Sequence, residues 1–241
     1  MSWYLALDTA TPLGSVAVGD HRGARAEATV GDRRHAAATL PAIEQVLQLA
    51  DLKLADLEGI VLADGPGSFT GLRIGFATAK GLLRQYTGLM LRVAPSLLSL
   101  AWRAAPFAGG PVAALYDALR GEVFAAVYLV SEGRIQTLLA PRLTTPEALV
   151  RAVPRVALAV GDGAAVHASL MRAWTGCAPV GPPAGVPRAG ALLELLDVPD
   201  ATTLVADPAA AEPTYGRLAE AQTRWEHAHG RALPHSPGET G

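Results

Sequence analysis

The chain has 241 residues, and 20 Lys and Arg residues against 22 Asp and Glu residues leave a formal net charge of -2. This balance argues against a protein that binds nucleic acid by itself, because such proteins carry a clustered basic surface. Hydrophobic residues make up 50% of the chain and charged residues only 17%, which excludes a disordered chain and predicts a large buried core.

A single cysteine, Cys177, excludes an intramolecular disulfide and a cysteine-based metal cage, and a reducing compartment is the simplest expectation. The first residues lack the basic segment and apolar segment of a signal peptide. The longest apolar run, residues 123–130, is far shorter than the roughly 20 residues that cross a bilayer. We therefore expect a cytoplasmic protein with no membrane-spanning segment.

The first half of the chain opens with a group of strands and then alternates helices and strands. From hydrophobic periodicity and turn residues we predict strands at 3–7, 15–18, 24–30, 57–63 and 89–93, and helices at 35–50, 72–85 and 95–105. Residues 106–110 break the pattern, which predicts a boundary between a first half at 1–106 and a second half at 107–217.

The second half begins as the first does, because a strand at 112–116 ends at Asp117 just as the strand at 3–7 ends at Asp8. Further strands are predicted at 122–130, 134–139 and 156–160, with helices at 145–153 and 188–196. The repeated order predicts an α/β protein of two ribonuclease-H-like halves with mixed sheets, in preference to a doubly wound dinucleotide-binding fold. The polar segment 218–241 is expected to be partly disordered.

The most distinctive segment, Gly65-Pro66-Gly67-Ser68-Phe69-Thr70-Gly71, joins a predicted strand to a predicted helix, where phosphate-binding loops occur. Thr70 stands where the G-x-G-x-x-G and G-x-S-x-G patterns need glycine, and the lysine of a Walker A loop is missing. The alternative is a structural role, in which the glycines allow a tight turn and a close approach of helix and sheet.

The helix at 72–85 carries small residues four apart in two stripes, Gly71, Gly75 and Ala79 in one and Ala77 and Gly81 in the other. A glycine inside a helix costs roughly 1 kcal/mol relative to alanine, so a close contact is expected to compensate for it. The contacting element belongs either to this chain or to a partner protein, and the residues alone leave both open.

The turns after Asp8 and Asp117 are the remaining candidates for chemistry. Asp8, Thr9 and Thr11 have oxygens and amides suited to a phosphate or a metal-bound water, but a ligand-free Asx or Ser/Thr turn uses the same residues. The six histidines form no metal-binding spacing. We therefore predict no metal site and no catalytic residue in this chain.

Four segments, 5–11, 65–75, 117–123 and 211–215, resemble the TsaB (YeaZ) family in the same order. The resemblance spans about residues 1–217, and its central block is the most specific part. It implies the actin-like ATPase (ASKHA) fold, which has two related halves. It also implies a non-catalytic scaffold that activates TsaD, the enzyme that transfers a threonylcarbamoyl group from threonylcarbamoyl-AMP to N6 of the adenosine beside the anticodon of tRNAs.

The partners implied by the resemblance are TsaD and the ATPase TsaE, with a homodimer when the chain is alone and tRNA contacted only through the complex. The helices at 35–50 and 72–85 would then form the surface that binds TsaD, which moves the glycine stripe toward the intermolecular interpretation. The residues expected on that surface are His35, Leu40, Ile43, Leu47, Gly71, Ile74, Gly75, Thr78, Ala79 and Leu82.

Two departures bear on catalysis. By our alignment Ser96 and Leu100 replace the histidine pair with which TsaD holds its metal, and neither offers a ring nitrogen. Actin-like ATPases use Asp-x-Gly at the first phosphate turn, whereas this chain has Ala10 after Asp8 and Thr9.

We therefore expect Asp8, Thr9, Thr11 and Asp117 to mark vestigial phosphate turns. No cofactor is expected on this chain alone, and ATP or ADP only at the partner interface. The alternatives are an actin-fold kinase that acts alone, based on the two aspartates and the glycine loop, and a peptidase-like protein.

Overall fold

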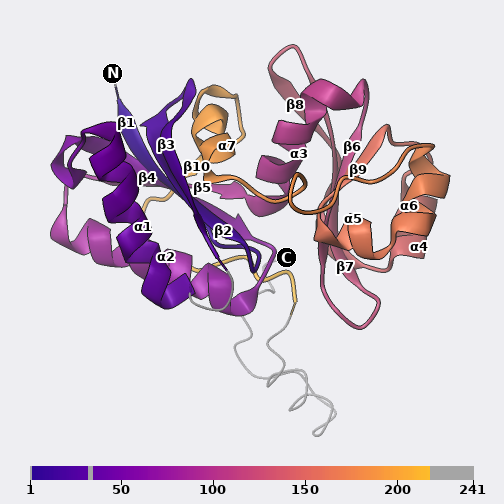
Figure 1. The fold of residues 1–241 in the computed structure, drawn as a ribbon, viewed down its shortest axis with the longest axis horizontal. Helices are drawn as coiled ribbons and strands as arrows, with labels where there is room; N and C mark the ends of the chain where they lie inside the picture. Colours follow the sequence, from indigo (N-terminus) through magenta and orange to yellow (C-terminus); the bar gives the residue numbers. More distant parts are fainter. Residues whose placement is uncertain (1, 32–34, 218–241) are drawn as a thin grey trace, which may run out of the picture.

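A computed structural model describes residues 2–31 and 35–217, with the side chains of residues 35 and 36 outside the described part (Figure 1). The segment predicted to be partly disordered, 218–241, lies outside the described residues. No described helix is both long enough and apolar enough to cross a membrane.

The first half is built on a six-stranded sheet in the order β10-β5-β4-β1-β2-β3. Strand β1 pairs antiparallel with β2 and parallel with β4. The strands are β1 (Trp3–Asp8), β2 (Gly14–Asp20), β3 (Gly23–Val30), β4 (Leu57–Gly65), β5 (Met90–Pro95) and β10 (Thr203–Leu204). The strands that the sequence predicts in this half are all present. Strand β10 was not predicted, because its two residues are too few to produce a periodic pattern.

The second half has a four-stranded sheet in the order β8-β7-β6-β9. Its strands are β6 (Val112–Asp117), β7 (Val123–Ser131), β8 (Arg134–Thr144) and β9 (Leu158–Val160). Strands β8, β7, β6 and β9 repeat the order and pairing of β3, β2, β1 and β4, with one parallel pair beside the antiparallel strands. The predicted actin-like ATPase fold of two ribonuclease-H-like halves is therefore confirmed.

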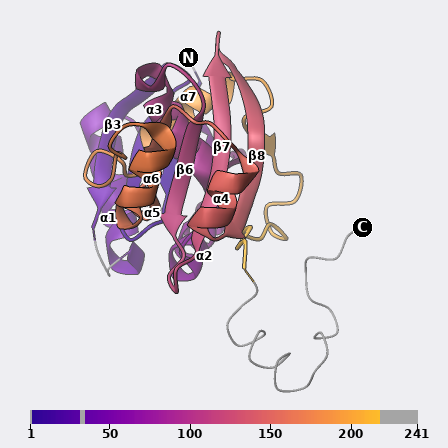
Figure 2. The same cartoon turned by 90° about the vertical axis from the view of Figure 1, so that its right-hand side faces the viewer.

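Helices cover both sheets and fill the space between them (Figure 1). Helices α1 (His35–Ala50) and α2 (Phe69–Gln85) lie on the outer face of the first sheet, and α3 (Ser96–Ala108) lies between the halves. On the outer face of the second sheet, Figure 2 shows α4 (Pro146–Ala152) and α6 (Ala168–Thr175), next to α5 (Asp162–Val166). Two short 3-10 turns (Leu54–Asp56 and Leu195–Asp197) and helix α7 (Ala189–Glu194) complete the described fold.

Successive side chains of a strand point to opposite faces, so each sheet contributes to two apolar layers. Leu5 and Leu7 of β1 pack with α1 and α2, whereas Ala6 faces the central layer around α3. A third layer lies under α4 and α6, where Leu149 and Met171 are buried. The central layer is shared by both halves.

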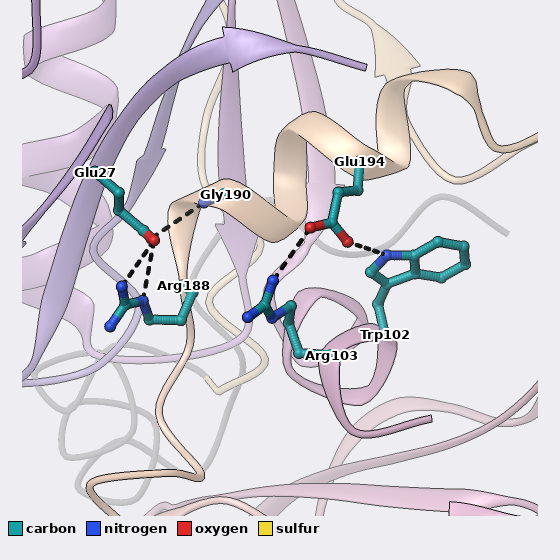
Figure 3. A network of polar contacts seen from close by, with 6 residues as sticks. All are labelled: Glu27, Trp102, Arg103, Arg188, Gly190 and Glu194. Atoms are coloured by element: carbon teal, nitrogen blue, oxygen red, sulfur yellow. Dashed lines mark hydrogen bonds and ion pairs between the residues drawn. The ribbon is translucent and has the colours of Figure 1, made fainter. Parts of the chain in front are cut away.

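The end of the chain differs from the predicted division, which placed all of 107–217 in the second half. Helix α7 packs against β1, β2 and β3 of the first sheet, and β10 pairs with β5. Figure 3 shows how α7 is held: Glu27 accepts hydrogen bonds from Arg188 and from the amide of Gly190. At its other end, Glu194 accepts from Trp102 Nε1 and Arg103, both on α3. The chain therefore crosses back to the first half after residue 188.

Candidate functional site: a cleft between the two halves

The turns after Asp8 and Asp117 line one cavity of about 680 Å³ between the halves. Strands β1 and β6 end at these aspartates and occupy equivalent places in the two sheets. One wall comes from Ala10, Thr11 and Pro12, and the opposite wall from Asp117, Ala118 and Leu119. The duplication noticed in the sequence thus brings two related turns together across a single cleft.

The glycine loop forms a third wall of this cleft, through Gly67, Ser68 and Phe69. A Cβ at position 67 would overlap the carbonyl oxygen of Ala10, and the Ser68 amide donates to that oxygen at 2.7 Å. The Ser68 hydroxyl accepts from the Gly71 amide at 3.2 Å and caps α2. The loop's glycines thus allow backbone to meet backbone, which is the structural role that the sequence left open.

Asp8 lies beneath the cleft and has no exposed surface. Its carboxylate accepts hydrogen bonds from the Ala10 amide at 3.2 Å and from the Ser99 hydroxyl at 3.1 Å. Burial raises the pKa of Asp8 from 3.8 to about 6, because the charged form loses hydration that these two bonds only partly replace. This aspartate is therefore an internal polar anchor of the turn and not a surface ligand.

Asp117 and Asp162 both line the cavity. Asp162 Oδ1 accepts from the amides of Asp117 at 3.1 Å and Gly163 at 2.8 Å, and burial raises the pKa of Asp162. Asp117 Oδ1 accepts from the Leu119 amide at 2.9 Å, the bond of an Asx turn. Asp162 was not predicted from the sequence. The duplication could have indicated it, because Asp162 follows β9 in the second half as the glycine loop follows β4 in the first half.

The residues predicted as phosphate turns divide into two pairs. Thr11 and Asp117 line the cavity, and the Thr11 hydroxyl donates to the Leu13 carbonyl at 2.8 Å. Asp8 and Thr9 are buried behind the cavity wall. Thr9 Oγ1 has no hydrogen-bond partner among the described residues and faces α2, 2.5 Å from the position of a Cβ at Gly75.

The C-terminal part of the described chain supplies a wall that the sequence did not predict. Tyr215 and Arg217 line the cavity, and the Tyr215 ring lies 4.6 Å from the Phe69 ring, centroid to centroid. Arg217 forms an ion pair with Glu122 of the second half. We call residues 212–217 the strap, because they contact both halves beside the cleft. The sequence did contain a signal for the strap, because the segment 211–215 is one of the four that carry the family resemblance. No role was predicted for that segment.

Half of the residues predicted to bind a partner are instead interior. Gly71, Gly75 and Ala79 are buried, and a Cβ at position 71 would overlap the Thr9 carbonyl oxygen. Ile43 and Leu47 are buried on the inner face of α1, which packs on the first sheet. The glycine stripe therefore faces its own chain, which corrects the intermolecular expectation. The helical period explains this, since it puts Gly75 and Ala79 on the same face as the apolar Leu72 and Phe76.

The other half of that set remains accessible or undescribed. Leu40 is 52% exposed, and Ile74, Thr78 and Leu82 are partly exposed, whereas the side chain of His35 lies outside the described residues. The second small-residue stripe, Ala77 and Gly81, is exposed, and a Cβ at Gly81 would meet no atom within 4 Å. Of the two small-residue stripes on α2, the exposed one is therefore that of Ala77 and Gly81.

Ser96 and Leu100, the positions aligned with a metal-binding histidine pair, lie at the start of α3 in the central layer. The Ser96 hydroxyl donates to the Pro66 carbonyl, and its own carbonyl accepts from the Tyr116 hydroxyl at 3.0 Å. Leu100 is 2% exposed. Across residues 2–31 and 35–217, no group of three or more His, Cys, Asp or Glu side chains has the geometry of a metal site.

Comparisons with known proteins found a matching family model, curated relatives and a similar solved structure. The family model described as "TsaD: tRNA N6-adenosine threonylcarbamoyltransferase" matches residues 29–177. The tRNA threonylcarbamoyladenosine biosynthesis protein TsaB of Bacillus subtilis (strain 168) is 29% identical over 80% of this chain and 84% of its own length. The protein of the same name from Escherichia coli (strain K12) is 36% identical over 54% of this chain and 57% of its own length. The solved structure of YeaZ from Pseudomonas aeruginosa has 30% identity and a TM-score of 0.74, covering 89% of this chain and 100% of that one.

Proposed function

This chain belongs to the TsaB (YeaZ) family, and we propose that it works in tRNA threonylcarbamoyladenosine biosynthesis as a non-catalytic scaffold that activates TsaD. The family relatives named above are biosynthesis proteins of this pathway. In the proposed scheme TsaD transfers the threonylcarbamoyl group from threonylcarbamoyl-AMP to the tRNA adenosine, and this chain holds TsaD in its active state.

The proposal that this chain is not catalytic rests on the environment of Ser96 and Leu100. A family model named for the transferase spans these positions, yet one is a buried hydroxyl bonded to a backbone carbonyl and the other a core leucine. Neither side chain provides the imidazole nitrogen that divalent transition metals favour. The metal-dependent step is therefore assigned to the partner.

The proposed partner surface is the outer face of α1 and α2, now centred on Leu40, Ala77 and Gly81. Small exposed residues on a helix let another helix approach closely, and the exposed Leu40 on the neighbouring helix α1 adds apolar surface. We propose TsaD as the occupant of this face and a second copy of the chain as its occupant when TsaD is absent. TsaE joins the complex. This chain contacts tRNA only through the complex, in keeping with its net charge of -2. The complex works in the cytoplasm.

No nucleotide is assigned to this chain alone. The turn after Asp8 lacks the glycine of actin-like ATPases, and the opposite wall of the cleft presents Asp117 and Asp162. The proposal therefore puts ATP or ADP only at the interface with the partner.

Reconstitution tests the proposal. Purified TsaD and TsaE with threonylcarbamoyl-AMP, ATP and unmodified tRNA should form threonylcarbamoyladenosine only when this chain is added, and this chain alone should form none. Product formed by the chain without TsaD would contradict the non-catalytic role. Turnover of Mg-ATP by the isolated chain would favour the kinase alternative.

A matched pair of variants tests the surface. Ala77→Arg places a long charged side chain on the exposed face of α2, whereas Ala140→Arg makes the same change on exposed β8 of the other half. We expect Ala77→Arg to abolish copurification with TsaD and Ala140→Arg to preserve it. Equal binding by both variants would reject this face. Light scattering with and without TsaD then tests whether Ala77→Arg also prevents homodimer formation.

A further inference from the structure

Two segments of chain cross between the halves beside α3. The first, residues 109–111, follows α3 directly and begins with Gly109, whose φ is +64°. The second leads back to α7, and its Pro183 and Arg188 line a hollow together with Phe107 of α3. Helix α3 has 13 residues and is therefore about 20 Å long, so its last residue lies far from Ser96 at the cleft end. A few loop residues such as these can absorb a rotation of one half against the other.

The strap makes a third connection, at the cleft. Residues 212–215 of the strap are firmly attached to the first half. The Thr214 amide donates to the Asp64 carbonyl at 2.8 Å, and Pro213 is buried. A Cβ at Gly65 would overlap the Thr214 carbonyl oxygen, so backbone lies directly against backbone here. This part of the strap therefore moves with the first sheet.

The end of the strap contacts the second half through side chains. Arg217 forms an ion pair with Glu122, and the two side chains are 32% and 37% exposed. Gly216 lies between the halves, because a Cβ there would come within 2.8 Å of Pro66 and 3.0 Å of the Phe124 ring. Ion pairs that water can reach contribute little, and each shifts an equilibrium by about fivefold at most. The strap is thus strongly held on one half and weakly held on the other.

We propose that Gly216 and Arg217 form a releasable latch, which holds the two halves together across the cleft. When the latch is released, the halves rotate apart about the two crossings beside α3. The attached part of the strap, 212–215, keeps the latch close to Glu122, so the latch closes again easily. The cavity of about 680 Å³ is the cleft in its latched form. The inference concerns this chain alone and does not rest on the role proposed with TsaD.

Pulsed electron paramagnetic resonance measures the opening of the halves. Spin labels are placed on cysteines introduced at Thr70 and Glu147, which are exposed on α2 and α4, in a chain whose own cysteine is removed by Cys177→Ser. We expect mainly one distance between the labels in this labelled parent. Arg217→Gln and Glu122→Gln each remove the ion pair and should raise the fraction of longer distances about twofold to fivefold.

A bulky residue at the other latch position should have a larger effect. Gly216→Val should raise the fraction of longer distances more than Arg217→Gln does, because a branched side chain does not fit between Pro66 and Phe124. A cooperative thermal transition is required of each variant, so that unfolding is not mistaken for opening. A folded Gly216→Val variant with the distances of the parent would overturn the proposal.

A second ion pair of the same strap is the matched control. Glu212 pairs with Lys80 of α2 at 3.4 Å, and this pair joins the strap only to the first half. Glu212→Gln should therefore leave the distances unchanged. Salt at 1 M reduces the Debye length to about 3 Å, so it should lengthen the distances in the parent but not in Arg217→Gln. Distances in Arg217→Gln that match those in Glu212→Gln, or an equal response of parent and Arg217→Gln to salt, would reject the latch.

Discussion

The carbonyl oxygen of Thr9 occupies the space that a Cβ at Gly71 would fill. Helix α2 therefore touches the turn after β1 through backbone atoms, with no side chain between them. The contact fixes the glycine loop against the first aspartate turn and so sets one side of the cleft.

Two alanine substitutions in α2 should have opposite effects. Gly71→Ala should lower the free energy of unfolding by about 1–3 kcal/mol, because the new methyl group must displace backbone. Gly81→Ala should raise it by about 0.5–1 kcal/mol, because its Cβ meets open space and alanine favours a helix. Urea unfolding of both variants provides the measurement. A stabilised Gly71→Ala variant would show that the close contact does not exist.

Asp8 should make the chain less stable as the pH rises. Its pKa is raised from 3.8 to about 6 in the folded state, so folding favours the protonated form and that contribution is lost as pH passes through 6. We expect Asp8→Asn to remove about 1–1.5 kcal/mol of the stability difference between pH 5 and pH 8. Burial also raises the pKa of Asp64 to about 6, so Asp64 makes its own contribution to the pH dependence of stability. The Asp8→Asn variant retains that contribution. The same pH dependence in both proteins, by urea unfolding, would contradict the burial of an ionisable Asp8.

The strap should be coupled to the glycine loop through one ring pair. Phe69 and Tyr215 lie 4.6 Å apart at an interplanar angle of 31°, and such pairs contribute about 0.5–1.5 kcal/mol beyond their buried area. A double-mutant cycle with Phe69→Leu and Tyr215→Leu should return a coupling energy in that range. Strictly additive effects would indicate that the strap does not rest on the loop.

Glu27 should matter more to stability than its place on an outer strand suggests. It accepts from Arg188 and from the Gly190 amide, which connects β3 to the start of α7 (Figure 3). Glu27→Ala should cost about 1–3 kcal/mol, because both donors lose a charged acceptor. The exposed Glu44 of α1 is the matched control, and Glu44→Ala should change stability by less than about 0.5 kcal/mol. Thermal unfolding of the two variants separates the outcomes.

Local pattern was sufficient for much of this fold. Alternating apolar residues and turn glycines predicted the strands ending at Asp8 and Asp117, and the equivalence of the two turns predicted that the halves are related. The turns then meet across one cavity. These features depend on neighbours close in sequence, which is why sequence reasoning found them.

Features set by contacts between distant segments were missed. Helix α6 is short, and the role of its apolar Met171 is seen only from its packing against the second sheet. The burial of Gly75 depends on the turn at Thr9, and the cleft wall at Tyr215 depends on Phe69. Small residues on a helix indicate a close neighbour but do not say whether that neighbour belongs to the same chain.

The return of α7 and β10 to the first sheet has a consequence for synthesis on the ribosome. The inner face of β1 and β4 gains Leu192 and Leu193 of α7 only after most of the chain has emerged. Until β10 arrives, β5 has an unpaired edge, which is the kind of edge that recruits strands from other chains. The sheet of the first half is therefore complete only once residues 189–204 have been made, and a chain that ends before them leaves the edge of β5 unpaired.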